Sequence, residues 1–469
     1  MQTENINLGT EKVNKLLFKL SVPATISLMV AQLYNVIDTI FLGKAIGTTG
    51  IGALAIAFPI QTLFLAISAM VASGSSSIAA RSFGAQDIEK GKKAAGNGII
   101  LCLLISFIMV VFTYIFLDPI LIFFGSSKEL LPYAKEYVSI VLLGGVLNTF
   151  VIVLPELIIA SGNSKVSMKA TIIGAITNVI LDYVFVILLH KGVTGAAIAT
   201  VIGQIFSSIY VIKHFTGKQS IYKLKLRHLN FDFSLIKEIV YIGIAALVID
   251  ASDALMSIVL NRVAGDLQGS LGITIAGIIT KITLFMDIPV IGITTGMQPI
   301  VSYNFGALRF NRLKNVLICA IKTIIAFSTI FWIGQLAFSR NIISLFINDS
   351  TVYKSAITAL RITIILFPLG GIYFISTYFY QSLGQGKLAL FFSLFKQIGV
   401  FIPLVYILCY GTKLSIYGLW LAFPISQLIA CIVSAICLRK TIHKLNIVSR
   451  KNIKKSFQYV HVFEGHRKE

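Results

Sequence analysis

Long apolar segments separated by short polar connections run through most of the chain. Each segment has about 20 residues or more, the length that an α-helix needs to cross the hydrocarbon core of a bilayer. The pattern predicts twelve membrane-spanning helices, at residues 14–41, 51–81, 94–117, 131–160, 166–189, 194–215, 235–261, 270–304, 314–338, 353–382, 388–410 and 414–438. The predicted fold class is therefore an all-α integral membrane protein.

The positive charges predict the orientation of these spans. With an even number of spans, both termini lie on one side. The connections on the other side hold seven Lys and Arg residues, whereas the connections on the terminal side, with both tails, hold twenty-eight. Because Lys and Arg accumulate in cytoplasmic connections, we predict a multi-pass protein of the cell membrane with both termini in the cytoplasm.

The two halves of the chain resemble each other. A shift of 222 residues superposes Phe83-Gly84-Ala85 on Phe305-Gly306-Ala307, and a shift of 223 superposes Gly195 on Gly418. Since each half has six spans, corresponding spans run in the same direction, which predicts two six-helix lobes related by a pseudo-two-fold axis along the membrane normal. The predicted organisation is a cytoplasmic N-terminus (1–13), an N-lobe (14–215), a cytoplasmic linker (216–234), a C-lobe (235–440) and a basic cytoplasmic tail (441–469).

Composition agrees with a membrane protein. The chain of 469 residues is 56% hydrophobic and 13% charged, whereas a soluble domain is about 25% charged. Its formal charge of +21 lies mostly between the apolar segments, so it points to orientation in a lipid bilayer and not to nucleic acid. We expect a monomer.

The most informative polar residues lie in the N-terminal half, inside apolar segments. Asn178 and Asp182 are four residues apart, so they share one face of a helix. A carboxylate in a bilayer costs about 2.5 to 3.5 kcal/mol on insertion scales, and chains keep such a group mainly where it handles an ion or a substrate. Counted from the predicted span ends, Asp38, Asp182 and Thr200 come out in one layer of the outer half of the lobe, about 9 to 12 Å deep.

This layer predicts an ion-coupling site made of Asp38, Asn178, Asp182 and Thr200, with Tyr34 and Asn35 within a turn of Asp38. Two neighbouring carboxylates can share a proton, because like charges disfavour double ionisation. The same oxygens can surround Na⁺, which is a hard cation. The alternative is a hydrogen-bonded cluster that only stabilises the bundle.

A second set of polar and aromatic residues predicts a substrate cavity between the lobes. In the C-lobe, a pairing of Lys281 with Asp250 or Asp253 is plausible because buried charges pair, and Arg361 is a candidate for the same network. A purely structural ion pair explains these charges equally well. The candidate cavity residues are Gln32, Phe58, Gln61, Glu156, Asp250, Asp253, Lys281, Asp287, Tyr373 and Tyr380.

The eighth predicted span carries helix-weakening residues. Pro289, Gly296 and Pro299 predict a bent helix that can act as a hinge. Small residues also allow close packing of membrane helices, and that explanation is equally good.

Sequence signatures of common enzymes are missing. The chain has no HExxH, no GxSxG and no GxxxxGK[ST] motif, and none of its six histidines falls in the middle of a predicted span. We therefore expect a protein that is not an enzyme, that has no organic or metal cofactor, and that draws on an ion gradient.

Several runs, taken together and in order, resemble the multidrug and toxic compound extrusion (MATE) family, and within it the DinF-like and MepA-like branch. They are Gln32-Leu33-Tyr34-Asn35-Val36-Ile37-Asp38-Thr39, Ala80-Arg81-Ser82-Phe83-Gly84-Ala85, Ala160-Ser161-Gly162-Asn163-Ser164-Lys165, Asn178 to Asp182, and Tyr303-Asn304-Phe305-Gly306-Ala307. The resemblance covers essentially the whole chain.

The resemblance implies cation-coupled export of amphipathic, often cationic, drugs by rocking of two lobes. It also implies that Asp38, Asn178, Asp182 and Thr200 form the coupling centre. The resemblance further implies that the NorM-like branch relies on acids of the C-lobe, in spans 7 and 10, whereas span 10 here offers Arg361 and no carboxylate. A sodium site of the NorM kind is therefore not expected in the C-lobe.

The predicted function is an antiporter in which H⁺ or Na⁺ enters from outside, occupies the Asp38–Asp182 layer and drives a small amphipathic cation outward. Two alternatives remain open at this point. A lipid-linked oligosaccharide flippase of the same superfamily would share the two-lobe plan, and a membrane enzyme would turn over its substrate without a gradient.

Overall fold

The computed structural model describes residues 8–217, 220–344 and 350–465; the first seven residues of the predicted N-terminus, residues 218 and 219 of the linker and the last four residues of the tail lie outside these ranges. The described part is helical. Its elements are α1 (Val13–Ile46), α2 (Thr48–Gly84), α3 (Ile88–Ile115), α4 (Leu117–Phe123), α5 (Leu131–Leu143), α6 (Gly145–Ala160), α7 (Ser164–Asp182), η1 (Tyr183–Leu188), α8 (Gly192–Thr216), η2 (Leu226–Leu229), α9 (Phe233–Gly306), α10 (Phe310–Ser344), α11 (Ser350–Thr363), α12 (Phe367–Ser382), α13 (Gly386–Leu394), η3 (Phe395–Phe401), α14 (Ile402–Tyr410) and α15 (Ile416–Gly465).

The helices reproduce the twelve predicted spans. In the described part, nine helices are long and apolar enough to cross a bilayer, and two bent pairs, α5 with α6 and α11 with α12, raise the number to eleven. The twelfth comes from α9, because its 74 residues contain a non-helical break at Gly269 that separates two spans. Helix α15 is longer than predicted, since it continues into the predicted tail as far as Gly465.

Backbone geometry shows the predicted repeat. Gly47 (φ 70°, ψ −146°) separates α1 from α2, and Gly269, 222 residues later, breaks α9 with nearly the same angles (φ 61°, ψ −144°). The bends of the two broken spans are also alike, at 54° and 53°. Such backbone angles are almost restricted to glycine, which explains why the sequence has glycine at both positions.

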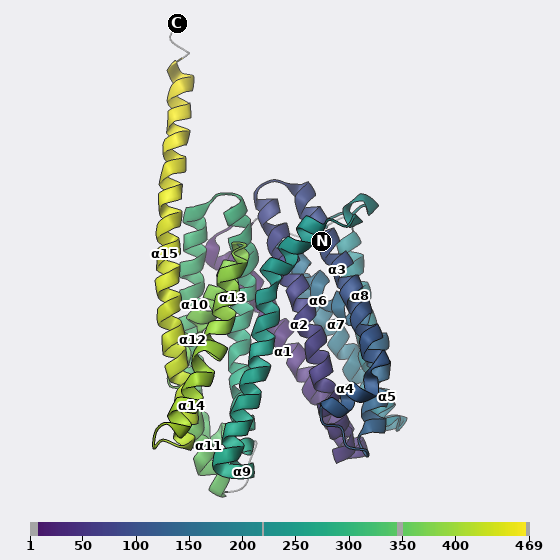
Figure 1. Ribbon diagram of the computed structural model, residues 1–469. Helices are drawn as coiled ribbons and strands as arrows, with labels where there is room; N and C mark the ends of the chain where they lie inside the picture. Colours follow the sequence, from purple (N-terminus) through teal and green to yellow (C-terminus); the bar gives the residue numbers. More distant parts are fainter. Residues whose placement is uncertain (1–7, 218–219, 345–349, 466–469) are drawn as a thin grey trace.

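The two lobes form a V (Figure 1). Helices α1 to α8 build the N-lobe, helices α9 to α15 build the C-lobe, and both termini lie at the end where the lobes meet. We call this end the terminal side and the other the open side. The common location of the termini agrees with an even number of spans.

Glycines allow the lobes to touch on the terminal side. A Cβ atom on Gly84 would lie 1.9 Å from the carbonyl oxygen of Tyr303, and one on Gly306 would lie 1.9 Å from that of Arg81. Gly74 and Gly243 make similar backbone contacts, with Ile239 and Met70. An ion pair between Arg81 and Glu238, with 3.2 Å between Nη2 and Oε1, also joins the lobes there.

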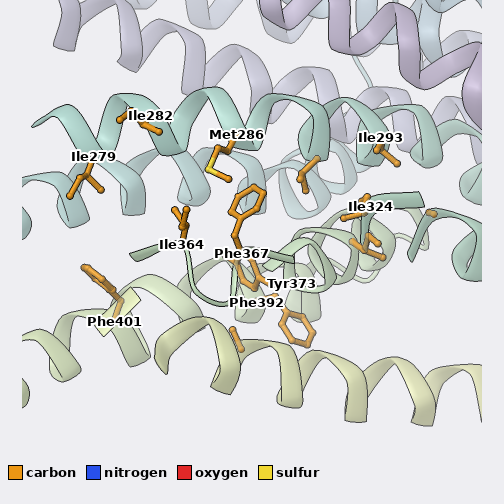
Figure 2. Packing of buried hydrophobic residues seen from close by; sticks show 14 of the residues in the cluster. Ile279, Ile282, Met286, Ile293, Ile324, Ile364, Phe367, Tyr373, Phe392 and Phe401 are labelled. Atoms are coloured by element: carbon orange, nitrogen blue, oxygen red, sulfur yellow. The ribbon is translucent and has the colours of Figure 1, made fainter. Parts of the chain in front are cut away.

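The first helix of each lobe begins in the hydrophobic core of the other lobe. Leu16, Leu17 and Leu20 of α1 belong to the hydrophobic core of the C-lobe, part of which Figure 2 shows. In return, Ile239 and Ile242 of α9 belong to the core of the N-lobe. This exchange follows the repeat, and it adds apolar contact between the lobes on the terminal side.

The connection between the lobes is packed and not loose. Tyr222 is 1% exposed, stacks on Phe215 and donates a hydrogen bond of 2.6 Å from Oη to the carbonyl oxygen of Leu157. Burial raises the pKa of the Tyr222 phenol above its ordinary value. The part of the predicted linker around Tyr222 is therefore anchored to the N-lobe.

Candidate ion and substrate site

Two aspartates face each other inside the N-lobe. Asp38 is 5% exposed and comes from the open-side half of α1; Asp182, at 0%, is the last residue of α7. The two carboxyl groups are close enough for a hydrogen bond between them, and the Asn178 side chain also contacts Asp38. The structure therefore brings together Asp38, Asn178 and Asp182, three of the four residues that the sequence placed in one layer.

Several oxygens of this cluster have no hydrogen-bond donor. Within the described residues, Oδ1 of Asp38, both carboxyl oxygens of Asp182 and Oδ1 of Asn178 are buried and unpartnered. Two ionised carboxylates have no proton to share, so their proximity leaves acceptors only. Buried polar atoms without partners are costly. A proton between the carboxyl groups would supply the missing donor, and Na⁺ would fit the same set of hard oxygens.

Hydroxyl and amide groups surround the carboxylates. Nδ2 of Asn178 donates to Oγ1 of Thr200 at 3.4 Å. Tyr34 lies beside Asp38. Asn35, which we predicted to join, instead donates to the carbonyl oxygen of Ala31 on an exposed face of α1. Asn35 directly follows Tyr34, and consecutive residues of a helix do not face the same way.

Tyr137 is a member of the cluster that the sequence analysis missed. Its hydroxyl accepts a hydrogen bond of 3.3 Å from Nε2 of Gln61 and lies beside Thr200 and Asp38, and its side chain is 2% exposed. In the sequence, Tyr137 is one of 17 tyrosines and nothing in its neighbourhood marks it. A polar neighbour can be recognised only after the fold brings α5 against α8.

A cavity of about 320 Å³ adjoins the cluster; N-lobe residues line it, together with Thr295 of α9. We call it the N-lobe cavity. This volume is in the range of small-molecule sites, about 300 to 1,000 Å³. Tyr34, Asn178 and Thr200 line its wall, so the cavity and the carboxylate cluster share residues. Glu156 of α6 is the one carboxylate in this lining, and it also lines a gap of about 10 Å³ beside Ser302 of the C-lobe.

A second charged group lies in the C-lobe. Lys396, on the π-helical turn η3, has its Nζ 5.0 Å from the ring centre of Tyr373 and 5.5 Å from that of Phe374. The charge of Lys396 acts on Asp253 and Asp287, and Gln397 donates a hydrogen bond to Oδ1 of Asp253. Glu156 and Asp250 act on the same tyrosine, Tyr378, so the group faces the N-lobe.

Two cations predicted for this group belong elsewhere. Lys281 is exposed, and no close ion pair in the described part of the chain includes it; the predicted pairing with an aspartate is wrong. Arg361 instead donates to Oγ of Ser339 at 3.0 Å from Nη2. The position of a residue along a helix does not fix the direction in which its side chain points.

Some predicted cavity residues do not line the N-lobe cavity. Phe58 is 64% exposed, and Gln32 is only partly buried and does not line it. Tyr380 is fully buried in the C-lobe core, where its ring stacks on Phe392 and its hydroxyl contacts Thr441. Gln61 lies apart from that cavity, against Tyr137.

The residues of the predicted hinge lie in a continuous helix. Within α9 the break is at Gly269, and the backbone stays helical through Pro289, Gly296 and Pro299. A Cβ atom on Gly296 would lie 2.4 Å from Oγ of Ser21. Close packing against α1 therefore accounts for Gly296, and a hinge action of the three residues stays a prediction.

Comparisons with known proteins agree with this architecture. The model of the MatE family matches residues 23–184 and 246–407, once in each lobe. The chain is 24% identical over 416 residues to the multidrug export protein MepA of Staphylococcus saprophyticus, covering 88% of this chain and 91% of the relative. It is 25% identical over 437 residues to MepA of Staphylococcus haemolyticus, covering 92% and 96%.

Among solved structures, the fold is similar to one described as the outward-facing conformation of a multidrug resistance MATE family transporter, with a TM-score of 0.90 and 24% identity over 95% of this chain and 99% of that chain. This likeness supports the two-lobe, twelve-helix fold.

Proposed function

Since the chain belongs to the MatE family of multidrug efflux transporters, we propose that it is an antiporter that exports small amphipathic cations in exchange for a coupling cation, a proton in the first place. The observation that carries this proposal is the set of donor-free oxygens on Asp38, Asn178 and Asp182. Each of these oxygens can accept a proton-bearing or cationic partner.

The exchange follows from shared residues. Asn178 contacts the carboxylates and also lines the cavity of about 320 Å³, as does Thr200. When a proton or Na⁺ binds between Asp38 and Asp182, the amide and hydroxyl groups reorient toward it, and the cavity loses polar contacts for the substrate. Binding of the ion and of the substrate then oppose each other, and this opposition is reciprocal by thermodynamic linkage.

Charge and shape suit a cationic, partly apolar substrate. Most of the cavity wall is apolar, with residues such as Leu28, Leu65 and Ile152, and Glu156 adds one negative charge at the end nearer the C-lobe. Apolar walls with a few fixed polar groups are typical of small-molecule sites. The ribbons of the two lobes diverge on the open side (Figure 1). With both termini in the cytoplasm, as we predict, that side faces outward, and we assign this arrangement to the state that releases substrate.

Replacing Asp182 by Asn tests the role of the carboxylate. The amide keeps the shape of the side chain but removes its charge and its ability to exchange a proton. We expect efflux of tetraphenylphosphonium from proteoliposomes to fall to the level of protein-free liposomes, with the thermal unfolding midpoint unchanged or raised.

Asp266→Asn is the matched control, because Asp266 is exposed and bonded only to Tyr410 among described contacts; it should transport normally. Imposing a pH gradient and a sodium gradient separately distinguishes the two ions. Normal ion-driven efflux by the Asp182→Asn protein would refute the proposal.

A further inference from the structure

The charged group of the C-lobe stands where the N-lobe has its cavity. Subtracting the repeat shift of 222 from six residues of this group gives six residues of the cavity lining. The C-lobe residues are Asp250, Asp253, Asp287, Tyr373, Tyr378 and Lys396. Their N-lobe counterparts are Leu28, Ala31, Leu65, Val151, Glu156 and Gly174.

Side-chain size and charge differ sharply between these two places. Where the N-lobe has Gly174 and Val151, the C-lobe has Lys396 and Tyr373, so long side chains take up space that is open in the N-lobe. Lys396 lies on η3, and its N-lobe counterpart lies within the α-helical part of α7. A π-helical turn redirects side chains and is frequent at functional positions.

The surroundings of Lys396 are those of a site for an organic cation. Its ammonium lies over the faces of Tyr373 and Phe374, an arrangement that attracts cations through the ring quadrupole. Asp253 and Asp287 add negative charge, yet neither makes a close ion pair with Lys396 among the described residues. A third carboxylate, Asp250, lies near Asp253, so the group holds three carboxylates and one ammonium.

Two further polar groups lack partners. The hydroxyl of Tyr373, on a side chain that is 2% exposed, and Oε1 of Gln397, on one that is 6% exposed, have no hydrogen-bond partner in the described residues. Both residues adjoin Asp253. A cluster built only to stabilise the lobe would use these groups.

We propose that the C-lobe contains a second site for a small organic cation and that Lys396 occupies it as a tethered cation, confining substrate to the N-lobe. The proposal rests on the proposed function of the N-lobe cavity as the substrate site. The chemistry is that of an alkylammonium or quaternary ammonium group. An anion is excluded by the three carboxylates, and a bare metal ion does not use the aromatic faces.

Removing the tethered cation should open the site. In Lys396→Ala, tetramethylammonium chloride should raise the thermal unfolding midpoint of the purified protein in a saturable way, on the order of 2 °C more than in the wild type. Sodium chloride at equal ionic strength corrects for screening. Any midpoint shift that tetramethylammonium causes in the wild type reports binding in the N-lobe cavity. Glu156→Gln should reduce that shift, but it should leave unchanged the additional shift that Lys396→Ala produces.

Matched variants separate a site from a general charge effect. Lys281→Ala removes an exposed lysine of the same lobe and should gain no response, and Lys396→Arg keeps a tethered cation and should also gain none. Lys396→Ala combined with Asp253→Asn should lose the gain. Equal tetramethylammonium-induced shifts of the midpoint in wild type and Lys396→Ala, or a gain that survives Asp253→Asn, would overturn the proposal.

A failure of Lys396→Ala to fold also decides the matter. In that case the three carboxylates lack a neighbouring cation. Tetramethylammonium present during expression and extraction should then restore the folded fraction, whereas sodium should not restore it. No such rescue would count against the proposal. Efflux by the Asp182→Asn protein tests the N-lobe independently, so the two proposals can fail separately.

Discussion

Replacing Gly84 by Ala should force the two lobes apart on the terminal side. The added Cβ would lie 1.9 Å from the carbonyl oxygen of Tyr303 and 2.7 Å from its carbon. Ordinary contact begins near 3.4 Å, so the lobes must separate by about 1.5 Å at this point. The obstacles are backbone atoms, which cannot rotate away as the end of a side chain can.

The cost of this overlap falls on the closed terminal side alone. Overpacking by a methyl group typically costs about 1 to 3 kcal/mol. An energy of this size, applied to one of two conformations, changes their ratio about 5- to 150-fold. The population that is open on the terminal side should therefore rise by this factor. Gly306→Ala, at the repeat-equivalent position against Arg81, should act in the same direction.

Alkylation of a cysteine at Ser302 measures this opening. Ser302 is 1% exposed and lies between the lobes, so a Ser302→Cys side chain should react only when they part. In a chain without its five native cysteines, the alkylation rate should rise with the open population. Gly277→Ala is the control, since no atom lies within 4 Å of its added Cβ. A Gly84→Ala protein that reacts as slowly as this control would refute the packing argument.

Two further predictions concern the coupling cluster and the break in α9. Tyr137→Phe removes the hydroxyl that contacts Gln61 and should weaken binding of the coupling ion by about 1 kcal/mol, or about fivefold; efflux at a small imposed gradient should show this, and Tyr183→Phe, on an exposed side chain, should not. Gly269→Ala places a Cβ at φ 61° and ψ −144° and should cost about 1 to 3 kcal/mol, visible as a lower unfolding midpoint, whereas Gly277→Ala should not lower it.

The spans and the pairing of Asp38 with Asp182 could be predicted from the sequence, because each depends on a residue pattern that is rare without a physical reason. A run of apolar residues is required to cross a bilayer, and a carboxylate inside such a run is expensive enough to be rare. The glycine pattern predicted the repeat, since Gly84 and Gly306 sit where two backbones touch. Each of these features depends on spacing along the chain, which the sequence contains.

The direction of side chains around each helix could not be predicted in the same way. Lys281 lies on an exposed face, and the lysine whose charge acts on Asp253 and Asp287 is Lys396. The turn η3 changes the helical phase near Lys396, so a count at 3.6 residues per turn misplaces its side chain. Tyr137 was missed for a related reason. Its hydrogen-bonding neighbours come from α2 and α8, so they reach its hydroxyl only once both helices pack against α5.

The location of Glu156 suggests how an ion on the open side can influence contacts on the terminal side. Asp38 and Asp182 do not contact the seam, by which we mean the contact between the lobes at Gly84 and Gly306. The ion therefore has no direct effect on the contact between the lobes there. Glu156 lines both the cavity that Asn178 and Thr200 share and the narrow gap beside Ser302. In the proposed antiport, a substrate cation in the cavity would neutralise this carboxylate, and an ion that displaces the substrate would restore its charge. Because a ligand shifts an equilibrium only by its difference in affinity between two states, we propose that the charge at Glu156 is what makes substrate and ion favour opposite arrangements of the lobes.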